Sequence, residues 1–176
     1  MTTARWAVAA VLLAAAAAAL IGGLVFLFRG DDDNATAPAG TLTTVLATAR
    51  PAEAPFAGLT ELRLSIGGDC RRVVVTDEVG ERAIGLMRRR DLGPYDGMLF
   101  VFERPVQGAF TMSDVPVSLD IGWYDAAGRS VDRLVMRPCP DRSVSECPSY
   151  RSDGPYSYAV ETLEGQLPAG ALSGCS

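Results

Sequence analysis

The 176-residue sequence contains no histidine and no lysine, so arginine supplies every basic side chain. Without histidine, a Ser-His-Asp triad, a Cys-His pair and a histidine-ligated zinc site are excluded. Without lysine, a Schiff base, a Ser-Lys dyad and a P-loop are excluded as well. Any chemistry must therefore use carboxylates, tyrosine, serine, threonine, arginine or cysteine. These absences favour a non-enzymatic protein and leave a carboxylate-dependent enzyme as the alternative.

The acidic balance of the chain limits its partners. The formal net charge is −5, and the arginines are scattered apart from Arg71-Arg72 and Arg88-Arg89-Arg90. A nucleic-acid-binding protein needs a basic surface to displace counterions from phosphates. We therefore expect no nucleic-acid partner. The sequence also predicts no cofactor and no metal site.

The longest uncharged run lies near the N-terminus, from Trp6 to Phe28. At a rise of about 1.5 Å per residue, a helix of this length crosses roughly 30 Å of hydrocarbon. A secretory signal peptide normally has an apolar region of only about 7–15 residues, so the pattern favours an uncleaved anchor over a cleaved leader. We predict a short cap at residues 1–5 and a single transmembrane helix at residues 6–28, with membrane lipid as its partner.

The flanks of this run indicate its orientation. Arg5 and Arg29 flank it equally, while the free amino group precedes it and Asp31-Asp32-Asp33 follow it, which favours a cytoplasmic N-terminus. Residues 29–58 are rich in Ala, Thr and Pro and show no sustained periodicity, so they are predicted to form a flexible linker. Residues 59–176 then form one folded domain on the extracytoplasmic side, in the periplasm or at the cell surface.

Short alternating segments dominate the predicted domain. One helix is expected, from a cap at Thr76-Asp77 to about Met87, with Val79, Ala83, Leu86 and Met87 on its inward face. The predicted strands cover residues 61–66, 70–76, 98–102, 108–112, 117–124, 130–137 and 156–163. The fold class is therefore mainly β (α+β). We expect a small barrel-like or two-sheet β domain with one short helix, preceded by the transmembrane helix.

The four cysteines admit three disulfide pairings. Cys139 and Cys147 close a short proline-containing loop, which makes a local bridge the favoured one. Cys70 and Cys175 would then join the second strand to the C-terminal tail. Disulfides persist in oxidising compartments, so this pattern supports an extracytoplasmic domain. A metal site is the alternative, but the Cys-x7-Cys spacing and the absence of histidine disfavour it.

Several ordered motifs resemble a widespread bacterial and archaeal family, the one catalogued as domain of unknown function 192. They include Glu81-Arg-Ala-Ile-Gly-Leu-Met-Arg88, Gly97-Met-Leu-Phe-Val-Phe102, Pro116-Val-Ser-Leu-Asp-Ile121 and Tyr158-Ala-Val-Glu-Thr-Leu-Glu-Gly165. The resemblance covers about residues 62–174. It implies a small, mostly β domain, often exported or membrane-tethered, with no established activity.

One segment departs from that family's pattern. Where relatives typically have Trp-Met-Lys-Asn-Thr, this chain has Thr111-Met-Ser-Asp-Val115. An aromatic side chain, a cation and an amide are lost together, and a carboxylate is gained. If these positions contact a ligand in relatives, the resemblance implies that this protein binds a different ligand or binds it more weakly.

The candidate ligand-binding residues are Arg82, Arg88, Met112, Asp114, Asp120 and Glu161. The three carboxylates could divide into acid and base roles or hold a hard cation, although Asp120 is also suited to fixing a turn. The two arginines could clamp an anion, or they could be the solvated face of a short helix. Met112 could line an adaptable pocket or fill the core.

The function favoured by these observations is a membrane-tethered, extracytoplasmic binding module of the cell envelope. An envelope polysaccharide or protein is the expected ligand. A carboxylate-dependent or metal-assisted hydrolase using Asp114, Asp120 and Glu161 is one alternative. A structural envelope protein is the other.

Overall fold

The computed structural model of the chain describes residues 42–175. The predicted cap, the predicted transmembrane helix at 6–28 and the first part of the predicted linker lie outside the described residues. Among residues 42–175, no helix is long and apolar enough to cross a membrane.

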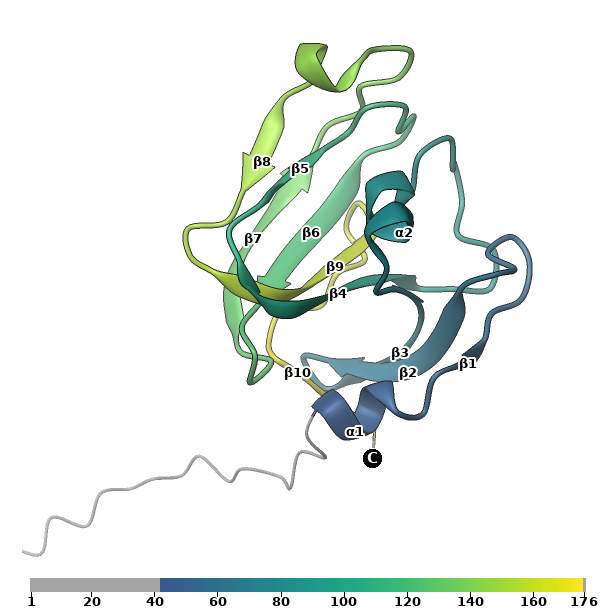
Figure 1. Ribbon diagram of the computed structural model, residues 1–176, viewed down its shortest axis with the longest axis vertical. Coiled ribbons are helices and arrows are strands. Elements are labelled where there is room, and N and C mark those ends of the chain that lie inside the picture. Colours follow the sequence, from purple (N-terminus) through teal and green to yellow (C-terminus); the bar gives the residue numbers. More distant parts are fainter. Residues whose placement is uncertain (1–41, 176) are drawn as a thin grey trace, which may run out of the picture. The chain divides into compact units, whose positions relative to one another are not determined.

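Within residues 42–175, ten strands form two sheets of mainly antiparallel strands, which confirms a mainly β fold (Figure 1). The large sheet has the order β1-β2-β3-β4-β9-β6-β7, and β10 also pairs with β2. A separate ribbon consists of β5 and β8. The strands are β1 (Arg50–Pro51), β2 (Thr60–Ile66), β3 (Asp69–Thr76), β4 (Gly97–Val106), β5 (Ala109–Thr111), β6 (Leu119–Tyr124), β7 (Ser130–Met136), β8 (Ser149–Arg151), β9 (Tyr156–Leu163) and β10 (Leu172–Gly174).

The large sheet is open, because β1 and β7 stand at opposite ends of the strand order and do not pair with each other. The predicted two-sheet arrangement is therefore confirmed, and the barrel-like alternative is wrong. The only parallel pair among these strands joins β3 to β4. A parallel connection requires a crossover, and the segment containing α2 provides it.

The described residues contain two short α-helices, α1 (Leu42–Leu46) and α2 (Val79–Ile84), and a 3-10 turn at Val144–Glu146, where the sequence predicted one helix. Leu42 and Val45 of α1 are buried against the large sheet, close to β2 and β10. The predicted linker, residues 29–58, therefore ends too late. The last part of this segment is folded because a few of its apolar side chains, including Phe56, are buried in the core. Its average composition is still that of a tether, which is why the sequence did not reveal this.

Helix α2 is shorter than predicted and its inward face is different. The Glu81 carboxylate accepts hydrogen bonds from the backbone N–H groups of Asp77 and Glu78 at its start. Gly85 ends it with a φ of 48° and ψ of −129°, a conformation that favours glycine. The predicted burial of Val79 and Ala83 is wrong. Val79 is 75% exposed and Ala83 is exposed. The helix ends at Ile84, and Leu86, which follows it, is the residue of the predicted apolar face that is buried in the core.

Both faces of the large sheet are covered by apolar side chains. We call the side that packs with Leu86, which follows α2, the α2 face; Phe100, Ile121 and Trp123 point to it. The opposite side, which packs with α1, is the α1 face and includes Leu99, Tyr124 and Val160. Because successive residues of a strand point to opposite faces, a shift of one residue decides which environment a polar side chain enters.

Both predicted disulfides are confirmed. Cys139 and Cys147 form the local bridge with a Cα–Cα distance of 5.9 Å, and Cys70 joins Cys175 at 5.5 Å. The second bridge closes 105 residues and ties β3 to the segment after β10. In the chain-entropy description, a loop of this length corresponds to about 4–5 kcal/mol of stabilisation.

Candidate functional site

A pocket of about 340 Å³ lies between α2, β4, β5 and β9. Helix α2 and the residues up to Met87 form one wall, residues 108–111 form a second, and side chains of β4 and β9 form the rest. The pocket exists because α2 is only six residues long and leaves part of the α2 face uncovered. Val79 and Ile84, which line the pocket, are 75% and 63% exposed, so its mouth is apolar.

Aromatic rings dominate the inner wall of the pocket. They belong to Phe100 and Phe102 of β4, Phe110 of β5 and Tyr156 of β9. Phe100 meets Phe110 edge-to-face at 5.1 Å between ring centroids, and Phe102 meets Tyr156 in the same way at 5.3 Å. Such pairs each contribute about 0.5–1.5 kcal/mol beyond burial and hold the rings in fixed positions. The wall is therefore preformed by packing within the domain.

Glu161 places a carboxyl group in this aromatic wall. It lies on β9 opposite Ile121 of β6 and Met98 of β4, so its side chain points to the α2 face. The residue is only 5% exposed, and within residues 42–175 its carboxyl group makes no hydrogen bond or ion pair. Burial away from water raises the pKa of Glu161 from 4.5 to about 8. The carboxyl group is therefore protonated at neutral pH.

Arg82 forms part of the outer wall of the pocket. Its guanidinium group lies 5.0 Å from the centre of the Phe102 ring and donates a hydrogen bond of 2.9 Å to the carbonyl oxygen of Val101. A further hydrogen bond goes to the carbonyl oxygen of Asp77. These contacts anchor α2 to β4. The charge of Arg82 therefore acts in holding the helix in place.

Thr111 also lines the pocket, but its Oγ1 atom is buried beneath the surface and has no hydrogen-bond partner among the described residues. A buried hydroxyl normally finds a partner in protein or water. Glu161 therefore supplies the carboxyl group in the lining whose hydrogen-bonding capacity residues 42–175 do not use.

The other predicted site residues lie elsewhere. Arg88 and Asp114 pair with each other at 3.1 Å, and Arg88 also donates its backbone N–H to the carbonyl oxygen of Asp114. Met112 is completely buried in the core. Asp120 accepts backbone hydrogen bonds from Gly165 at 2.8 Å and Leu167 at 3.3 Å. Three of these four residues therefore fix loops, and the fourth fills space.

The carboxylates needed for the hydrolase alternative are not brought together. Asp120 lies opposite Thr162 in the β6–β9 pair, whereas Glu161 lies opposite Ile121. Residues directly opposite each other share a face of the sheet, so Asp120 points to the α1 face and Glu161 to the α2 face. Asp114 is bound to Arg88 outside the pocket. Residues 42–175 contain no group of three His, Cys, Asp or Glu side chains placed to hold a metal ion.

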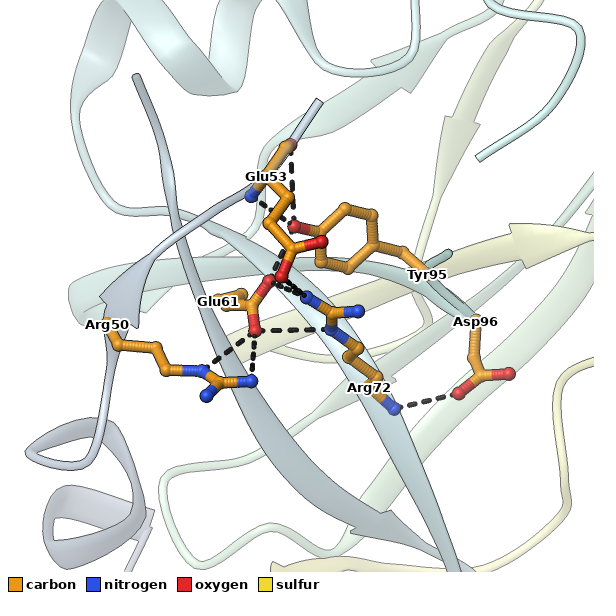
Figure 2. A network of polar contacts seen from close by, with 6 residues as sticks. All are labelled: Arg50, Glu53, Glu61, Arg72, Tyr95 and Asp96. Atoms are coloured by element: carbon orange, nitrogen blue, oxygen red, sulfur yellow. Dashed lines mark hydrogen bonds and ion pairs between the residues drawn. The ribbon is translucent and has the colours of Figure 1, made fainter. Parts of the chain in front are cut away.

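A second buried carboxylate has a full set of partners. Figure 2 shows the Glu61 carboxylate accepting hydrogen bonds from Arg72 at 2.6 Å, Tyr95 at 2.5 Å and Arg50 at 2.9 Å. The hydrogen bond from Arg72 is the main reason that the pKa of Glu61 falls to about 2. Glu53 also pairs with Arg72. This network joins β1, β2, β3 and the loop before β4. Because the Glu61 carboxylate already has donors from three side chains, its role is structural.

Two of the six predicted site residues, Arg82 and Glu161, therefore line the pocket. Sequence reasoning missed its phenylalanines and Thr111. The apolar run before Glu103 indicated a buried strand, and no local pattern distinguishes a ring packed in the core from one facing a pocket. The unusual signal was a glutamate, Glu161, inside the alternating apolar strand of residues 156–163.

The chain belongs to the DUF192 family, whose model is described as "Uncharacterized ACR, COG1430" and matches residues 62–173. This confirms the resemblance noted in the sequence. No curated protein matches the chain.

Two solved structures share the fold. A protein of unknown function from Novosphingobium aromaticivorans DSM 12444 is 23% identical and superimposes with a TM-score of 0.59, over 72% of this chain and 92% of its own. A protein from Sinorhizobium meliloti 1021, described as a candidate transcription regulator, is also 23% identical. Its TM-score is 0.55, over 70% of this chain and 98% of its own. At this identity the likeness concerns the fold alone.

Proposed function

We propose that this protein is a membrane-tethered, extracytoplasmic binding module of the cell envelope, and that its domain takes a small, largely apolar ligand in the α2 pocket. The observation that carries the proposal is the preformed aromatic pocket containing Glu161. Its volume of about 340 Å³ falls within the range of roughly 300–1,000 Å³ that is usual for small-molecule sites. Apolar walls with a few polar groups are also typical of such sites.

The location in the envelope is supported by two independent features. The uncharged run from residue 6 to residue 28 is long enough to serve as an anchor. All four cysteines of the domain are paired, and such bridges persist in oxidising compartments. The net charge of −5 gives no support to a nucleic-acid partner, so the description of the S. meliloti protein is not carried over to this chain.

Binding in the pocket can be tested with N-phenylnaphthylamine, a neutral apolar fluorophore that brightens in apolar surroundings. Ala83 is exposed and lines the pocket, so an Ala83→Trp substitution places a large side chain over the cavity without disturbing the core. Ala126→Trp, in the exposed β6–β7 turn, is the matched control. We expect the full chain and the control variant to enhance the fluorescence, and the Ala83→Trp variant to lose most of the enhancement.

Equal fluorescence enhancement with both tryptophan variants would show that the fluorophore binds elsewhere. No enhancement with the unmodified chain would remove the support for a binding module.

A further inference from the structure

We infer that the ligand of the α2 pocket carries a cationic amine, which forms an ion pair with Glu161. This inference rests on the proposed function and specifies the chemical class of the ligand. It follows from a carboxyl group that has no partner within residues 42–175 and lies in a pocket lined mainly by aromatic and aliphatic side chains.

Glu161 differs from the other buried carboxyl groups of the domain in its lack of hydrogen-bond donors among the described residues. Glu61 has three side-chain donors, and Asp120 has two backbone donors. Glu161 is buried to a similar extent and has no donor within residues 42–175. Buried acidic groups in proteins are nearly always hydrogen-bonded or paired. Because Glu161 lines the pocket, a ligand can supply the missing donor.

The aromatic surroundings of the Glu161 carboxyl group favour a cation. Aromatic rings attract cations through the negative potential over their faces. The domain already uses this attraction at the pocket, since Arg82 lies over the Phe102 ring. Phe100, Phe110 and Tyr156 remain around the pocket. An ammonium group has donors and no acceptor, and the Glu161 carboxyl group in the lining can accept its hydrogen bonds once ionised.

The same features disfavour two other ligand classes. A hard metal ion requires six or more oxygen ligands or several waters, and the pocket offers one carboxyl group. An anion would find no cationic side chain among the described lining residues that is ready to bind it. Arg82 is the arginine that lines the pocket, and its hydrogen bonds already go to the carbonyl oxygens of Val101 and Asp77.

Binding of a cation also moves a proton. Arg82 and Tyr156 are the other ionisable residues that line the pocket, and the ligand is already protonated. Burial raises the pKa of Glu161 to about 8, so at neutral pH the carboxyl group must ionise when the ammonium group arrives. The carboxyl proton leaves to the solvent buffer, and the ligand keeps its own. Affinity should rise about tenfold per pH unit up to the pKa of Glu161 and then level off.

Isothermal titration calorimetry with phenethylamine and phenethyl alcohol tests the inference, because these probes are similar in size and differ in charge. Glu161→Gln removes the charge and keeps the shape. Glu103→Gln makes the same change at an exposed position of β4 outside the pocket. We expect phenethylamine to bind the unmodified full chain and the Glu103→Gln variant with release of a proton. The Glu161→Gln variant should bind phenethylamine roughly 30-fold or more weakly than the unmodified chain does.

The possible failures are distinguishable. If phenethyl alcohol and phenethylamine bind equally well, and Glu161→Gln does not change their affinities, the inference of a cationic ligand is refuted. The proposal of a binding module would still stand. If the neutral fluorophore binds but phenethylamine does not displace it, the inference of a cationic ligand is likewise refuted and the binding module remains. If neither phenethylamine nor the fluorophore binds, the proposed function fails together with the inference.

The ammonium group can be supplied by a free amine or by a lysine side chain of a peptide. The peptide Gly-Lys-Gly and the same peptide acetylated at the lysine amine form the second arm of the titration. Tighter binding of the unmodified peptide than of phenethylamine would assign a peptide ligand, and the reverse order would assign a small amine. Both results support the ion pair with Glu161, provided that acetylation or Glu161→Gln weakens binding.

Discussion

Replacing Glu161 by glutamine removes a carboxyl group that titrates inside the core, and this should change how the stability of the domain depends on pH. In the unfolded chain the carboxyl group titrates near its ordinary pKa of 4.5, whereas burial raises its pKa in the folded domain to about 8. Between these values the folded state holds the proton and the unfolded state does not. The free energy of unfolding contributed by this group therefore falls as pH rises.

The size of the effect follows from the difference between the two pKa values. One pKa unit corresponds to about 1.4 kcal/mol, so a difference of about 3.5 units corresponds to about 5 kcal/mol. This contribution is fully present below about pH 4.5 and is lost as pH rises through about 8. The slope in between is about 1.4 kcal/mol per pH unit. Glutamine has a similar shape and does not titrate, so the Glu161→Gln variant should lack this slope.

Urea denaturation of the full chain, followed by near-ultraviolet circular dichroism, measures the free energy of unfolding between about pH 5 and pH 9. Subtracting the curve of the Glu161→Gln variant cancels the titration of all other groups. Glu103→Gln is the control, because Glu103 is exposed, and its curve should follow that of the unmodified chain. Parallel curves for the unmodified chain and the Glu161→Gln variant would show that Glu161 is not buried without a partner.

Stability and location can be tested in three further ways. Glu61→Gln should lower the free energy of unfolding at neutral pH by about 2–3 kcal/mol, because a charge-assisted hydrogen bond from Arg72 is weakened. It should also remove the loss of stability as pH falls from about 4.5 through about 2, and an unchanged acid transition would contradict the network. Replacing both Cys70 and Cys175 by serine should cost about 4–5 kcal/mol in urea denaturation. Peptide mapping of the non-reduced protein from the cell envelope should recover both bridges, and free thiols at all four cysteines would contradict an exported domain.

Much of the fold could be predicted because its signals are local. Alternation of apolar and polar residues located the strands around Leu64, Val74 and Ile121, each with an error of a few residues at the ends. The disulfides followed from loop length and the even number of cysteines. Helix α1 was missed, since two buried side chains, Leu42 and Val45, anchor it within a segment of linker-like composition.

The site was only partly predictable because it depends on contacts between distant segments. Glu161 and Arg82 were among the candidates, but the sequence could not separate them from Asp114 or Asp120, which are also polar residues near apolar strands. The hydrogen bonds of Asp120 come from residues 165 and 167, about 45 positions further along the chain. No local pattern specifies such partners.

The sequence by itself predicted seven of the ten strands that residues 42–175 form, the favoured disulfide pairing, the family and the chemistries that the absence of histidine and lysine excludes. These properties depend on residue type and short spacing. Only the tertiary structure decided that the sheet stays open, that Asp120 and Glu161 point to opposite faces, and that α2 leaves aromatic rings and a carboxyl group facing a pocket. These properties depend on which elements pack together, and burial by distant elements controls both the exposure of Glu161 and its pKa.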